Sequence, residues 1–75
     1  MEYIVIVAGE WTREGTVGVV FTHLWNGKRW IGPGPGAKEF KSREDAQREM
    51  KKVPFKGDFV GIYTEAKETL HLLNG

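Results

Sequence analysis

One segment constrains the fold more than any other: residues 38–54 carry the clearest helical pattern in the chain. Ser42 is a suitable N-cap, because its hydroxyl can accept a hydrogen bond from a free backbone N–H of the first turn. Pro54 ends the pattern, because it biases the preceding residue away from helical dihedrals. The apolar positions form one narrow stripe: Ala46, Met50 and Val53. The pattern predicts one helix, over about residues 43–53, that depends on contact with another element.

The remaining segments have the patterns of strands and turns. Four runs rich in β-branched and aromatic residues are predicted strands: 2–8, 16–25, 28–31 and 59–63. In the last segment, 64–75, the alternation of Leu70 and Leu72 favours a strand. The spacing of Ala66, Leu70 and Leu73 would also suit a helix. The order β-β-β-α-β-β predicts an α+β fold, a small antiparallel sheet with one helix packed on one face.

The turn Asn26-Gly27 separates the second and third predicted strands and is the strongest short hairpin signal in the chain. Both residues tolerate the positive φ of a two-residue type I′ turn. Such a turn predicts three cross-strand pairs: Trp25–Lys28, Leu24–Arg29 and His23–Trp30.

The first predicted strand is apolar on both faces, so both faces need cover. One face carries Tyr3, Val5 and Val7, and the other carries Ile4, Ile6 and Ala8. A short helix can cover only one face of a small sheet. The other face is therefore expected to be closed by the sheet curling on itself, by a loop, or by a second subunit in a homodimer.

The length of 75 residues predicts a single domain, 1–75, with a thin core. The absence of cysteine excludes disulfides and thiolate zinc sites, and it fits a cytoplasmic location. The apolar run 3–8 is too short for a signal peptide or a membrane span. Net charge is only +1, but residues 38–56 hold seven basic and four acidic side chains. The helix and its flanks are therefore expected to form a mildly basic face.

No pattern indicates catalysis, a metal or a cofactor. His23 and His71 lie in predicted strands and Ser42 already caps the helix, so no nucleophile–base pair is indicated. The ligand spacings of zinc and calcium motifs are absent. The Gly-Pro run 32–36 has two prolines without N–H groups, which excludes a P-loop and favours a stiff connection over the sheet. We therefore expect a protein that is not an enzyme.

Aromatic and basic side chains favour a binding function instead. Exposed Trp, Tyr and Arg dominate the energetics of protein interfaces, and Trp11 lies in a predicted polar loop where no periodicity requires burial. We predict a protein partner that is bound through these residues: Trp11, Trp25, Lys28, Arg29, Trp30, Arg43 and Arg48. Core burial is the alternative role for each tryptophan.

Nucleic acid or a nucleotide is the alternative partner. Trp25, Lys28, Arg29 and Trp30 interleave aromatic and basic side chains on one hairpin beside the Gly-Pro run, as in single-strand binders. Against this, the chain is nearly neutral, whereas nucleic-acid-binding domains are usually strongly basic. The salt dependence of binding distinguishes a protein partner from a nucleic-acid partner, because binding driven by phosphate contacts weakens steeply as the salt concentration rises.

The segment Ala37–Ala46 has the sequence AKEFKSREDA and is preceded by Trp30. It resembles a recurring element of small phage and bacterial accessory proteins, in which a β-hairpin leads to a helix start of the form A-x-x-F-x-[ST]-x-E-[DE]-A. The resemblance covers residues 25–53. It implies an α+β miniprotein that often acts by binding something of the host, such as a polymerase, a nuclease or a defence effector, and that could inhibit this partner. It carries over no catalytic or binding residue.

Overall fold

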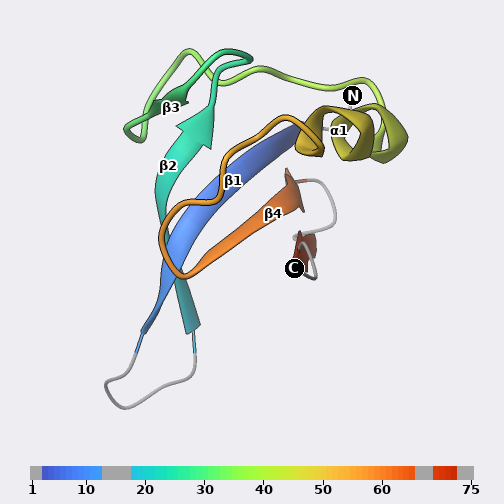
Figure 1. The fold of residues 1–75 in the computed structure, drawn as a ribbon. Helices are drawn as coiled ribbons and strands as arrows, with labels where there is room; N and C mark the ends of the chain where they lie inside the picture. Colours follow the sequence, from blue (N-terminus) through green and yellow to red (C-terminus); the bar gives the residue numbers. More distant parts are fainter. Residues whose placement is uncertain (1–2, 13–17, 66–68, 73–75) are drawn as a thin grey trace.

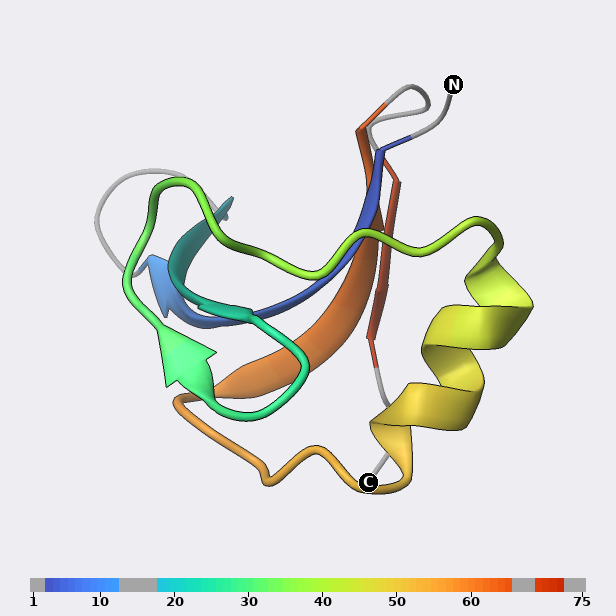
Figure 2. The same cartoon turned by 90° about the horizontal axis from the view of Figure 1, so that it is seen from above.

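The computed structural model describes residues 3–12, 18–65 and 69–72. These residues form five strands and one helix, with the following bounds: β1 Ile4–Thr12, β2 Gly18–Trp25, β3 Trp30–Ile31, α1 Arg43–Met50, β4 Phe59–Thr64 and β5 Thr69–Leu72. The strands make one antiparallel sheet in the order β3-β2-β1-β4-β5, and α1 lies to one side of it (Figures 1 and 2). The predicted α+β class is confirmed, and the last segment does contain a strand.

Helix α1 begins at its predicted cap, where the Ser42 hydroxyl accepts a hydrogen bond from the Asp45 N–H at 3.2 Å. Its apolar stripe is turned to the core: Ala46 and Met50 are buried and Val53 is half-buried. The predicted helix end at 53 is wrong, because α1 ends at Met50. The N–H groups of Lys52 and Val53 each bond to the carbonyl three residues earlier, so the chain tightens into turns before Pro54.

Strand β1 is the centre of the sheet, and its first part, Ile4 to Ala8, is buried on both faces. On the helix side it belongs to a larger core, which consists of Ile4, Ile6, Ala8, Trp25, Phe40, Ala46, Met50, Val60 and Ile62. On the other side, Val5 and Val7 are buried with Phe59 beneath partly buried neighbours, among them Phe21, Leu24 and Tyr63. The sheet is strongly curved (Figure 2). The second face is therefore closed within the chain, by the curled sheet together with Ala37 of the connection between β3 and α1, which combines two of the predicted alternatives.

The β2–β3 turn differs from the prediction. Trp25 pairs with Trp30 and Leu24 with Ile31, so the connection has four residues, 26–29, and the predicted pairs are wrong by two positions. The Asn26 side-chain oxygen accepts from the N–H groups of Lys28 and Arg29, at 2.8 Å each, and this stabilises the longer turn. Because the shift is an even number of residues, the alternation of faces is unchanged.

Asn26→Ala should destabilise the domain by about 1 kcal/mol, because it removes the acceptor of two backbone N–H groups in an exposed turn. We expect Tm to fall by about 5 °C in thermal unfolding followed by circular dichroism. Lys28→Ala is the matched control, because the turn uses only the backbone of Lys28. Equal losses in the two variants would contradict this role of Asn26.

The connection from β3 to α1 enters the sheet rather than only passing over it. The pairing of β2 with β1 stops at Val7 and Leu24. Beyond that point, the Lys38 N–H donates to the Trp25 carbonyl and the Phe40 N–H donates to the Ile4 carbonyl, both at 2.9 Å. Residues 38–40 therefore take the place beside β1 that β2 leaves, and they bring Phe40 into the larger core.

Candidate protein-binding surface

The long strands β1 and β2 extend beyond the rest of the sheet. Strand β4 pairs with β1 only from Ile4 to Ala8, whereas β2 pairs with β1 as far as Thr12. Residues 9–12 and 18–21 therefore form a two-stranded ribbon, which we call the arm (Figure 1). The predicted first strand, 2–8, is thus too short.

A β-bulge marks the base of the arm. Ala8 pairs with His23 and Gly9 with Phe21, which leaves Thr22 as an extra residue on β2. The Thr22 hydroxyl lies 3.5 Å from the Ala8 carbonyl and 3.0 Å from Nδ1 of His23. Through the Thr22 hydroxyl, the His23 ring is connected to the backbone of β1, as expected for a histidine with a structural role. The side chain of His71 lies outside the described part of the structure.

The arm exposes large apolar side chains. Trp11 is 43% exposed, Val19 38% and Val20 49%. Trp11 and Val19 lie directly opposite each other in the register and share a face. The Trp11 ring also contacts Phe59, with 5.0 Å between ring centroids. One side of the indole is therefore anchored on the cluster of Val5, Val7 and Phe59, the smaller of the two cores. The other large apolar side chain that is exposed in the described residues is Phe55, in the loop after α1.

The two outer edges of the arm differ. On the β1 side, the Gly9 carbonyl accepts from the Asp58 N–H at 2.8 Å. The backbone N–H of Trp11, on the same side, donates to the Asp58 carboxylate at 3.2 Å. On the β2 side, β3 pairs only with Leu24 and Trp25. Within the described residues, no strand pairs with the outer edge of Gly18–His23.

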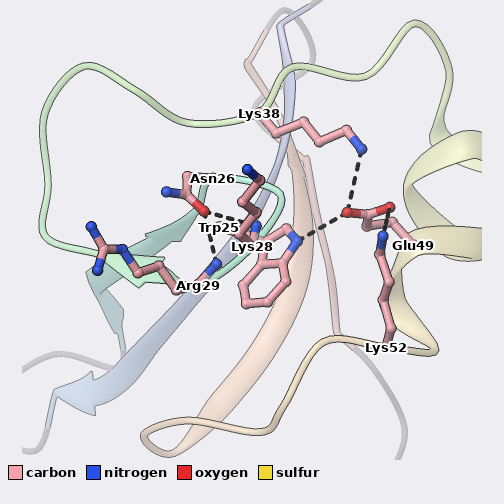
Figure 3. A network of polar contacts seen from close by, with 7 residues as sticks. All are labelled: Trp25, Asn26, Lys28, Arg29, Lys38, Glu49 and Lys52. Carbon is pink, nitrogen blue, oxygen red and sulfur yellow. Dashed lines mark hydrogen bonds and ion pairs between the residues drawn. The ribbon is translucent and has the colours of Figure 1, made fainter.

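A polar network connects the helix to the hairpin (Figure 3). The Glu49 carboxylate accepts from Nε1 of Trp25 at 3.1 Å and lies 3.3 Å from the ammonium groups of Lys38 and Lys52. The Glu49 side chain is only 9% exposed. Burial alone would raise its pKa, but the hydrogen bonds from Trp25, Lys52 and Lys38 outweigh burial, so the pKa of Glu49 lies below its usual value. This network joins elements that are distant in sequence.

The structure separates the predicted binding residues into groups. Trp25 is 3% exposed and belongs to the larger core. Trp30 is half-buried against that core, and its indole N–H donates to the Pro54 carbonyl at 2.9 Å. Lys28 and Arg29 are exposed beside them in the turn. The hairpin therefore brings the four residues together, but with its tryptophans turned to the core.

The other three predicted binding residues lie apart from the hairpin turn. Arg43 and Arg48 are exposed on α1, and Arg48 forms an ion pair with Asp45 one turn earlier. Trp11 lies in strand β1 rather than in the predicted polar loop, and it is exposed on the arm. The predictions did not include Val19, Val20 and Phe55. The absence of charged residues from the run 18–25 could have indicated Val19 and Val20 as binding residues. Their exposure at a sheet edge, however, depends on the whole fold.

Within the described residues, no group of three or more His, Asp or Glu side chains is placed to hold a metal ion. No helix there is long and apolar enough to cross a membrane. Comparison with protein-family models, curated proteins and solved structures found no match to this chain. The resemblance of residues 25–53 to phage and bacterial accessory proteins stays a prediction.

Proposed function

We propose that this chain is a non-enzymatic protein-binding domain whose partner docks on the arm. The observation that supports the proposal most is the position of Trp11, Val19 and Val20, three of the four large apolar side chains that the described residues expose. Trp11 and Val19 share one face of the arm, whereas Val20 lies on the other face opposite Glu10. Exposed apolar groups on both faces of so short a ribbon are typical of an interaction site at its edge. A tryptophan anchored on one side by Phe59 is also pre-organised for contact, which lowers the entropy lost on binding.

The chemistry of the arm suits a protein better than a nucleic acid. Among the described residues of the arm, Glu10 is the one charged side chain, so a phosphate backbone would find no cation there. The hairpin offers Lys28 and Arg29, but its Trp25 ring is buried and cannot stack on a base. An apolar partner segment would instead gain from covering Trp11 and Val19, which share one face of the arm.

Selection of peptides from a random library on the immobilised full-length chain tests this proposal. Selected peptides should be apolar and β-prone, and their affinity should change little with salt. Trp11→Ala should weaken their binding by about 30-fold, as expected for an interface tryptophan that contributes about 2 kcal/mol. Thermal unfolding of the variant separates lost binding from lost folding, since Trp11 also contacts Phe59.

A variant with charge reversal at the hairpin is the matched control. Lys28→Glu/Arg29→Glu changes two exposed cations away from the arm and should leave peptide binding unchanged. The proposal fails if the hairpin variant loses binding while Trp11→Ala keeps it. It also fails if the chain binds single-stranded oligonucleotides with steep salt dependence and selects no peptide.

A further inference from the structure

We infer that a second copy of this chain is the partner of the arm, and that the two copies pair through the outer edges of their β2 strands to make one continuous sheet. The inference rests on the proposed function and specifies its partner and its geometry. Pairing of β-strand edges satisfies backbone N–H and C=O groups that an open edge leaves to water.

In the part of the chain that the structure describes, the arm offers one edge for such pairing. On the β1 side, the backbone N–H of Asp58 donates to the Gly9 carbonyl, and the Asp58 carboxylate accepts from the backbone N–H of Trp11. Asp58 therefore caps that edge. The β2 edge has no such cap among the described residues. A partner strand is therefore directed to β2.

The β2 edge of the arm lacks the charged and proline residues that protect most edge strands, and the bulge at Thr22 is the one protective feature of its described part. Natural edge strands carry lysine, proline or inward-pointing charges that discourage a second strand. The segment Gly18–Leu24 has the sequence GVVFTHL, which contains no lysine, no proline and no formal charge apart from a titratable histidine. Val19 and Val20 are exposed within it, where a protected edge would place charged groups.

The same composition makes this strand complementary to itself. Two antiparallel copies related by a twofold axis near Val20 would bring no like charges opposite each other. Val19 of one copy would then lie opposite Phe21 of the other, on the face that carries Trp11. A foreign acidic or basic segment would gain no ion pair from this uncharged strand. A second copy therefore fits the edge better than a charged partner does.

Two features limit the length of the pairing. Strand β3 already occupies the outer edge at Leu24 and Trp25. The bulge at Thr22 bends the strand just before that point. The pairing is thus confined to the arm.

Solution mass of the full chain and of charge variants at Val20, measured by light scattering on a sizing column and by sedimentation velocity, tests the inference. Wild type should be a dimer. Val20→Lys and Val20→Glu should each raise the dimer dissociation constant about tenfold or more, because each places like charges near the twofold axis. An equimolar mixture of the two variants should recover the dimer, because opposite charges then meet. Circular dichroism checks folding, since Glu10 lies opposite Val20 in β1.

Phe55→Lys is the matched control, because Phe55 is 64% exposed but lies off the arm. This variant should stay as dimeric as wild type. The inference is overturned if wild type is monomeric at millimolar concentration, if the Val20 variants stay dimeric, or if their mixture fails to recover the dimer. In each of these cases, loss of peptide binding in Trp11→Ala would still support the proposed function, so the two failures are distinguishable.

Discussion

Gly9→Ala should remove a large share of the stability of the domain. A Cβ at position 9 would lie 2.1 Å from the backbone carbonyl oxygen of Val20 and 2.7 Å from the Phe59 ring. The ring can shift, but the carbonyl belongs to the paired strand β2 and cannot move without opening the base of the arm. We expect a loss of about 3 kcal/mol or more, which is a large share of the stability of a small domain.

Urea unfolding followed by tryptophan fluorescence measures this loss. Gly32→Ala is the matched control, because a Cβ at position 32 would have no atom within 4 Å. The control should change stability by less than about 0.5 kcal/mol. If Gly9→Ala is as stable as Gly32→Ala, then β1 and β2 do not approach each other at the bulge as described.

Glu49→Gln should destabilise the domain by about 2 kcal/mol at neutral pH. The substitution replaces a charged acceptor of the Trp25 N–H by a neutral one and leaves Lys38 and Lys52 without their carboxylate. The contribution of the lysines is small, because both are exposed. The main loss comes from the charge-assisted hydrogen bond to the buried indole.

The same carboxylate predicts how stability depends on pH. The pKa of Glu49 in the folded state is lower than the 4.5 of an unperturbed glutamate, so the unfolded chain binds more protons in the interval between the two values. The stabilisation by the Glu49 carboxylate is fully present at pH values above its pKa in the unfolded chain. This stabilisation is lost as the pH falls through its pKa in the folded state. The free energy of unfolding should therefore drop on acidification below about pH 4.5 by more in wild type than in Glu49→Gln.

Glu39→Gln is the matched control for both measurements, because Glu39 is an exposed carboxylate that lies outside the first turn of the helix. At neutral pH, this control variant should be nearly as stable as wild type. On acidification, its free energy of unfolding should fall by nearly the same amount as that of wild type. Identical acid profiles for wild type and Glu49→Gln would show that the network around Glu49 does not stabilise the folded state.

The helix and the fold class were predictable because their signals are local. The Ser42 hydroxyl bonds three residues ahead, and Ala46 and Met50 lie one turn apart on the same face, so neighbours along the chain specify them. The doubly apolar β1 likewise required cover on both faces wherever the rest of the chain lay.

Local signals failed where a distant contact decided the outcome. The two-residue turn at Asn26 was favoured by dihedral preferences alone. In the structure, the four-residue turn lets Trp30 reach the Pro54 carbonyl and Trp25 reach Glu49, both 24 residues away. These contacts turn the hairpin tryptophans to the core, although their spacing with Lys28 and Arg29 is equally typical of an exposed binding surface.

By itself, then, the sequence determined the class of the fold, the start of α1 and the need to bury both faces of β1. These follow from hydrogen bonds and periodicities that act within a few residues. Only the tertiary structure decided which tryptophan is exposed and which strand edge is open. Asp58 caps the β1 side of the arm from 47 residues beyond Trp11, and nothing in the described structure caps β2. Exposure at an edge depends on which elements arrive beside it, and that is a property of the whole fold.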